Sequence, residues 1–98
     1  MKQKINAAIQ LVPLANKQEA IEKIDETIKI IENSGLHYKV CPFETVITGT
    51  FEEIIDLLKK IYEASFSLKF NEYLINIKLH ISTKENLHFE KNIEKYIL

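Results

Sequence analysis

The residue types that most often carry out chemistry are few in this sequence and lie far apart. The three histidines, His37, His80 and His88, show neither the HxxH nor the HExxH spacing of a metal site, so only the fold could assemble one. Cys41, the only cysteine, could be a nucleophile with a distant histidine, but a small residue at a strand end is the simpler interpretation. The sequence therefore predicts no catalytic residue, no metal site and no bound cofactor.

Carboxamide side chains give the stronger signal. Asn6, Gln10 and Asn76 fall on the less apolar parity of two segments that alternate as β-strands do. A carboxamide offers a donor and an acceptor side by side, and an aminopyrimidine presents a complementary pair. Each amide alone is explained by a solvated sheet face, so it is their alignment on neighbouring strands that favours a binding role.

The charged residues argue against nucleic acid as a partner. The sequence has 13 lysines, no arginine and 14 acidic residues, which gives a net charge of -1. A chain this close to neutrality has no field to attract a polyanion, and it lacks the planar guanidinium that grips a phosphate or a guanine edge. A neutral or cationic heterocycle suits this surface better than a phosphate ester.

Length and composition indicate one small globular domain over residues 1–98. Hydrophobic residues make up 46% of the chain, so a folded core is expected and disorder is not. No apolar run approaches the length of a signal-peptide core or a membrane span, so we expect no membrane partner. A single cysteine fits a reducing compartment such as the cytoplasm.

In the first third of the chain, a segment of alternating apolar and polar residues is followed by a segment with the apolar spacing of a helix. Residues 4–12 predict a strand with one fully apolar parity, ended by Pro13. Asn16, with a carboxylate three residues later, is typical of a helix start, and apolar residues at spacings of three and four extend this helix over 17–33. The apolar parity of the strand consists of Ile5, Ala7, Ile9 and Leu11.

The rest of the sequence predicts two short strands, a helix, a long strand and a short helix. Residues 36–41 and 44–49 are the two short strands, and Thr50 with Glu53 forms a capping box for the helix that follows. Residues 72–82 alternate as the longest strand. The last amphipathic helix carries Phe89, Ile93, Tyr96 and Ile97.

The order of these elements predicts an α+β protein with the ferredoxin-like βαββαβ fold and an extra short C-terminal helix. Right-handed crossovers and a central hairpin then give a four-stranded antiparallel sheet in the order 4-1-3-2, with both main helices on one face. We expect these helices to cover the apolar parity of the first strand and a second apolar row on the last strand. That second row is Ile75, Ile77, Leu79 and Ile81.

The second face of such a sheet would be mixed in character. It would carry Asn6, Ala8, Gln10 and Val12 from the first strand and Asn76, Lys78 and His80 from the last. A domain this small buries only about two thirds of the surface of its unfolded chain, so it gains by covering this face. We therefore expect a symmetric homo-oligomer whose open sheet meets another subunit or a ligand.

One stretch of the chain carries a recognisable pattern. Residues 35–49 read GLHYKVCPFETVITG and resemble the second and third strands of the small thiamine-binding protein family, long known as a domain of unknown function, with the approximate pattern G-[LM]-x-Y-x-[VL]-x-P-x-x-T-x-[IV]-x-G. Residues 8–13, 51–54 and 90–96 are also similar to that family, so the likeness covers nearly the whole chain. The motif is more specific than a lone glycine pattern and less specific than a complete zinc signature.

The resemblance implies a ferredoxin-like protein that assembles through its sheets into a homotetramer, a dimer of dimers. It also implies a cytoplasmic protein that binds thiamine or its hydroxymethylpyrimidine portion without catalysis, in thiamine salvage or homeostasis. The alternative is a regulatory or scaffolding oligomeric domain with no small-molecule ligand. An enzyme acting on a pyrimidine is a third reading, for which no acid-base pair can be identified.

Thiamine joins an aminopyrimidine to a thiazolium cation, and the two halves need different partners. Gln10 and Asn76 could pair with the aminopyrimidine through their amides. The cation needs an aromatic face or a carboxylate, which Tyr38, Phe43 or Glu44 could supply.

The threonine of the motif is the last candidate, because the hydroxyl of Thr45 could donate to the ligand. Each of these roles has a simpler structural alternative. Tyr38 and Phe43 could pack at a subunit interface, and Thr45 could serve only as a strand-favouring residue. The candidate ligand-binding residues are Gln10, Tyr38, Phe43, Glu44, Thr45 and Asn76.

Overall fold

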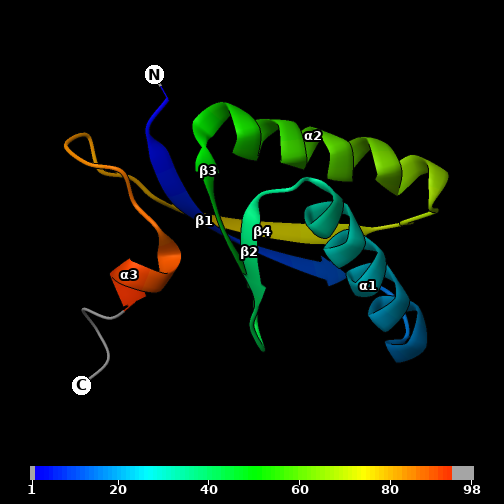
Figure 1. Cartoon of the computed structure of the whole chain (residues 1–98). Coiled ribbons are helices and arrows are strands. Elements are labelled where there is room, and N and C mark those ends of the chain that lie inside the picture. The colour runs from blue at the N-terminus through cyan, green and yellow to red at the C-terminus, as the bar shows by residue number, and fades with distance from the viewer. Residues whose placement is uncertain (1, 94–98) are drawn as a thin grey trace.

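The structure is a computed structural model that describes residues 2–93. The elements follow the predicted order along the chain (Figure 1). They are β1 (Lys4–Pro13), α1 (Lys17–Asn33), β2 (His37–Val40), β3 (Thr45–Thr50), α2 (Phe51–Ser67), β4 (Tyr73–His80) and α3 (Phe89–Ile93).

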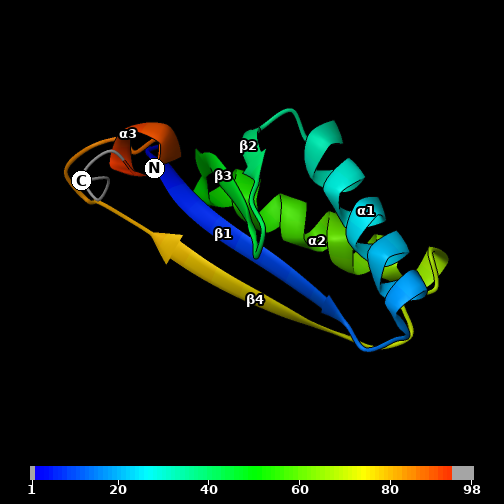
Figure 2. The same ribbon diagram turned by 90° about the horizontal axis from the view of Figure 1, so that it is seen from below.

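The strands form one four-stranded sheet in the order β2-β3-β1-β4, and every neighbouring pair is antiparallel. Read from the other end this is the order 4-1-3-2, so the predicted ferredoxin-like fold is confirmed. Figure 2 shows α1 and α2 on the same side of the sheet and β4 at the edge away from the helices. The opposite side of the sheet, which α1 and α2 leave uncovered, is called the open face below.

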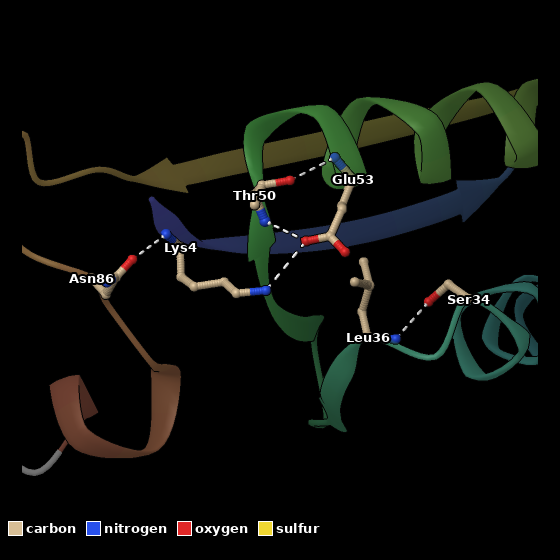
Figure 3. Close-up of polar contacts among 6 residues, drawn as sticks. All are labelled: Lys4, Ser34, Leu36, Thr50, Glu53 and Asn86. Atoms are coloured by element: carbon tan, nitrogen blue, oxygen red, sulfur yellow. Dashed lines mark hydrogen bonds and ion pairs between the residues drawn. The ribbon is translucent and has the colours of Figure 1, made fainter. Parts of the chain in front are cut away.

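Local side-chain caps begin both long helices where the sequence predicts them. The backbone N–H of Glu19 donates to Asn16 Oδ1 over 2.9 Å at the start of α1. At the start of α2, Thr50 Oγ1 accepts from the Glu53 N–H over 3.1 Å, and the Thr50 N–H donates to Glu53 Oε1 over 2.8 Å (Figure 3). α1 ends before Gly35, whose φ of +77° suits a residue without Cβ.

We expect the Glu53 carboxylate to make the fold less stable when it is protonated at acid pH. The hydrogen bond from the Thr50 backbone N–H, together with the charge of Lys4 3.4 Å away, holds the pKa of Glu53 below its ordinary value of 4.5. A carboxyl with a lowered pKa stabilises the fold above the unfolded-state pKa, and this contribution disappears as the pH falls through the folded-state pKa. Urea unfolding of the wild type and of Glu53→Gln, at neutral pH and near pH 3, measures how much the Glu53 charge contributes to the free energy of unfolding.

The difference in unfolding free energy between the two proteins should shrink as the pH falls. Glutamine can still accept the Thr50 hydrogen bond, so the variant removes the charge and keeps the capping box. A difference that stays constant over this pH range would contradict the expected role of the charge.

The core lies between the helices and the first and third strands. It contains residues from the predicted apolar parity of β1 and apolar residues of α1 and α2, joined by a residue at the middle of β3. The buried cluster is Ile5, Ala7, Ile9, Ile31, Ile47, Ile54, Leu57 and Ile61.

The apolar row of β4 departs from the prediction. Leu79 lies opposite Ala7 and Ile77 lies opposite Ile9, so this row shares the helix side of the sheet with the core. Ile77 and Leu79 are nevertheless 39% and 42% exposed, and Ile75 is the member that packs against the core. The prediction that the helices cover the whole row is therefore wrong, because α1 and α2 lie over β1 and β3 and stop short of the edge strand.

The C-terminal segment covers one end of the open face. The Phe89 N–H donates to Thr48 Oγ1 over 3.1 Å, and Thr48 Oγ1 in turn donates to Asn6 Oδ1 over 2.9 Å. α3 lies at the end of the sheet away from α1 (Figures 1 and 2), and its first turn is capped by His88 Nδ1, which accepts from the Glu90 N–H over 3.2 Å. Tyr96 and Ile97, assigned to the same helix from the sequence, lie outside the described residues.

Candidate functional site

The amide residues of the open face divide into two groups. Asn6 is buried under the C-terminal segment, where it accepts from Thr48. Gln10 and Asn76 lie directly opposite each other on β1 and β4 at the uncovered end of the face. The Asn76 amide Nδ2 donates to Gln10 Oε1 over 3.2 Å. The fold therefore pairs two of the three amides and separates the third from them.

The Gln10–Asn76 pair has the chemical form needed to bind a heterocycle edge. Their mutual bond uses one donor of Asn76 and the acceptor of Gln10. The remaining groups are the amide N–H of Gln10 and the carbonyl oxygen of Asn76, a donor and an acceptor that a ligand edge can meet together.

A carboxylate joins this pair from the loop before β3. Thr45 of β3 lies opposite Ile9 of β1, and the two strands are antiparallel. Glu44, one residue before Thr45, therefore lies beside Gln10. Asn76 is on the other side of β1. The backbone carbonyl of Glu44 accepts from the Cys41 N–H over 2.9 Å, which closes the loop between β2 and β3. Glu44 Oε1 lies 3.5 Å from the ammonium of Lys78 on β4, and the Glu44 side chain is 30% exposed.

A groove opens where β1 extends beyond β3. The register between these strands ends at Ile9, whereas β1 continues beside β4 as far as Pro13. The space between this part of β1, helix α1 and the β2–β3 loop is a groove of about 190 Å³. Its apolar walls are Ile9, Leu11, Ile24, Ile28 and Val40.

Four of the six predicted ligand-binding residues line this groove. They are Gln10, Phe43, Glu44 and Thr45. Thr45 is buried on the helix side of the sheet, and Phe43 is 81% exposed at the loop. Asn76 stands behind Gln10 through their hydrogen bond. Most of the predicted residues thus border the groove, with the Gln10 side chain on the open face and Thr45 on the helix side.

Tyr38 lies away from the groove. On β2 it lies opposite Ile47 of β3 and packs against the hydrophobic core of its own chain, whereas the structural alternative for this residue was packing at a subunit interface. Its ligand-binding role stays a prediction.

Sequence reasoning missed the helical wall of the groove and one charged neighbour. Ile24 and Ile28 were visible only as part of an amphipathic stripe, which by itself indicates core packing. Lys78 fell on the open-face parity of its strand, but nothing in its spacing pairs it with Glu44. A periodicity assigns a residue to a face, and it does not show which distant residue lies beside it.

The size of the groove limits what it can hold. Clefts for drug-sized ligands have volumes of about 300–1,000 Å³, so a groove of about 190 Å³ suits a single ring. The rest of a two-ring ligand would extend over the loop or the open face.

The described residues offer no candidate metal-binding site. The rings of His37 and His88 approach to 5.4 Å between centroids. No group of three or more histidine, cysteine or carboxylate side chains among residues 2–93 is arranged to hold a metal ion. No helix in the same part of the chain is long and apolar enough to cross a membrane.

The ferredoxin-like sheet, with its amide pair beside a small groove, defines an α+β protein with a candidate small-ligand site. The chain belongs to the thiamine-binding protein family, whose family model matches residues 7–97. This match covers the groove, the amide pair and the C-terminal segment.

A curated relative is similar over part of the chain. The UPF0045 protein CPE1503 of Clostridium perfringens is 29% identical over 58 residues, which are 59% of this chain and 61% of that protein. The similarity thus spans less than two thirds of the length of the relative.

Solved structures match over almost the whole chain. Protein TM0486 of Thermotoga maritima, named for a suggested role in thiamine biosynthesis or salvage, has a TM-score of 0.83 at 27% identity, with 96% of this chain and 99% of that chain covered. Protein SP2199 of Streptococcus pneumoniae has a TM-score of 0.79 at 27% identity, with 94% and 99% covered.

Proposed function

We propose that this protein binds thiamine or its hydroxymethylpyrimidine portion, without catalysis, in thiamine salvage or homeostasis. The observation that carries the proposal is the Gln10–Asn76 amide pair beside Glu44 on the open face, at the strand edge where the apolar groove opens. Membership of the thiamine-binding protein family supports the same ligand class.

The two halves of thiamine match different parts of the site. The aminopyrimidine pairs with the amide N–H of Gln10 and the carbonyl of Asn76 on the open face, beside the strand edge where the groove opens. The thiazolium cation lies near Glu44 and the exposed ring of Phe43. The ligand is held and released unchanged, and no further cofactor takes part.

Free thiamine fits this site better than thiamine diphosphate. The sequence contains no arginine to form a bidentate contact with a phosphate. The carboxylate of Glu44, beside Gln10, attracts the thiazolium and repels a phosphate group.

The protein is proposed to act as a homo-oligomer, a tetramer built as a dimer of dimers. Along the edge strand β4, Leu74, Ile77 and Leu79 are exposed large apolar residues, and they occupy both sides of that strand. A symmetric partner would cover them and add walls to a groove that is small for a two-ring ligand. A cytoplasmic location is proposed as well, since Cys41 is a free thiol.

Thermal unfolding with and without ligand tests the binding proposal. At a thiamine concentration about 100 times its Kd, binding should add about 2.7 kcal/mol and raise Tm by roughly 10 to 20 °C. Hydroxymethylpyrimidine should also raise Tm, whereas adenine and thiamine diphosphate serve as the comparison ligands and should shift it less. The absence of a shift with both thiamine and hydroxymethylpyrimidine would refute the ligand assignment.

A scaffolding or regulatory domain without a ligand is the second candidate. The exposed apolar residues of β4 favour it, because a subunit contact alone would explain them. An oligomer that forms normally but shows no Tm shift with any of these compounds would support this function over ligand binding.

A further inference from the structure

Two lysines stand at the ends of one row across the open face. The register places Lys78 of β4 opposite Ala8 of β1, and Ala8 opposite Val46 of β3. Val46 in turn lies opposite Lys39 of β2. Both lysines are exposed and share the open face, but the ion pair to Glu44 is made by Lys78.

The Lys78 side chain crosses a neighbouring strand to make this pair. Glu44 lies beyond β1 from Lys78, and the ammonium reaches its Oε1 at 3.5 Å. The residue beneath the crossing is Ala8, whose methyl group is small enough for a lysine stem to pass close to the sheet. The ammonium therefore lies at the Glu44 carboxylate, near the Gln10 position on the open face.

The two partners of this ion pair differ in how firmly they are held. The Lys78 side chain is 79% exposed, whereas that of Glu44 is 30% exposed. Ion pairs with an exposed member contribute little, so the ammonium is easily displaced. The carboxylate is the fixed charge, and Lys78 is a movable internal cation that occupies it.

We propose that Lys78 is a specificity-determining residue, because a cationic ligand must displace its ammonium from Glu44 while a neutral ligand need not. This inference rests on the proposed binding of thiamine at the Gln10–Asn76 pair and Glu44. The Lys78 ammonium and the thiazolium of thiamine compete for the same carboxylate, that of Glu44. This competition lowers the preference for thiamine over the neutral hydroxymethylpyrimidine.

Isothermal titration of two ligands against matched variants tests this role. In Lys78→Met the affinity for thiamine should rise about two- to fivefold at low ionic strength, the range that an exposed ion pair allows. The affinity for hydroxymethylpyrimidine should stay unchanged, which also verifies that the variant is folded. At about 1 M salt, where the Debye length is about 3 Å, the gain for thiamine should largely vanish.

The control is Lys39→Met, which removes the same charge from the same row. It should change thiamine affinity less than Lys78→Met does. Combining Lys78→Met with Glu44→Gln should abolish the gain, because the neutral amide no longer attracts either cation.

The outcomes separate this inference from the proposed function. If both ligands bind the wild type but Lys78→Met leaves thiamine affinity unchanged, the role of Lys78 is refuted and the binding function stands. Equal gains from Lys78→Met and Lys39→Met would reveal a general charge effect and would also refute it. If neither ligand binds the wild type, both the function and this inference fall.

Discussion

Gln10→Leu is expected to weaken the binding of both thiamine and hydroxymethylpyrimidine by about 10- to 100-fold. Leucine keeps the approximate size of the side chain but removes the open-face amide that accepts from Asn76. A bound aminopyrimidine would then bury polar atoms without partners, and unpaired buried polar groups cost more than a lost surface hydrogen bond. Titration of each ligand at constant pH and salt gives the change in Kd.

A neighbouring substitution shows whether this loss is local to the site. Val12→Thr changes polarity on the same strand and face as Gln10, beside Leu74 and outside the groove lining. It should leave both affinities unchanged. If Gln10→Leu also left them unchanged, the aminopyrimidine would not use this amide, and the assignment of the groove would be wrong.

Ile47→Ala should have the largest effect on folding, with a loss of about 2–5 kcal/mol in the free energy of unfolding. Ile47 lies at the centre of β3, is 0% exposed and belongs to the cluster that joins the sheet to both helices. Removing its outer carbons leaves a cavity that the packed neighbours fill only in part. Typical domains have stabilities of about 5–15 kcal/mol, so this loss is a large fraction of the total. Urea unfolding with an unchanged m-value would measure it.

The adjacent residue provides the matched control. Val46 points to the open face opposite Ala8 and is half-buried in the isolated chain. Val46→Ala should therefore cost much less than Ile47→Ala. If the two costs were equal, the open face would be packed against a partner, and the scaffolding function would gain support over ligand binding.

Local signals accounted for the two long helices and for the residues at which they begin. The Asn16 cap and the Thr50–Glu53 capping box join residues three apart, so each can form within its own segment. Apolar alternation in β1 likewise identified the buried face from Ile5 to Leu11. The order of the strands then followed from the handedness of the crossovers.

The candidate site was only partly predictable, because its residues come from separate segments. The motif and the amide pattern brought Gln10, Phe43, Glu44 and Thr45 into one list, and these four line the groove. The same motif also included Tyr38, which packs against the core. A sequence motif does not separate ligand contacts from packing residues, since both are needed at fixed positions in a strand.

The amino-acid sequence alone determined the elements, their order and the family to which the chain belongs. Tertiary structure alone decided that β1 extends past β3, that the groove opens at that point and that Lys78 crosses β1 to reach Glu44. It also left Ile77 and Leu79 exposed on a row that alternates as a core row would. The physical reason is that alternation and caps act within a few residues, whereas strand register and helix placement depend on packing between distant segments.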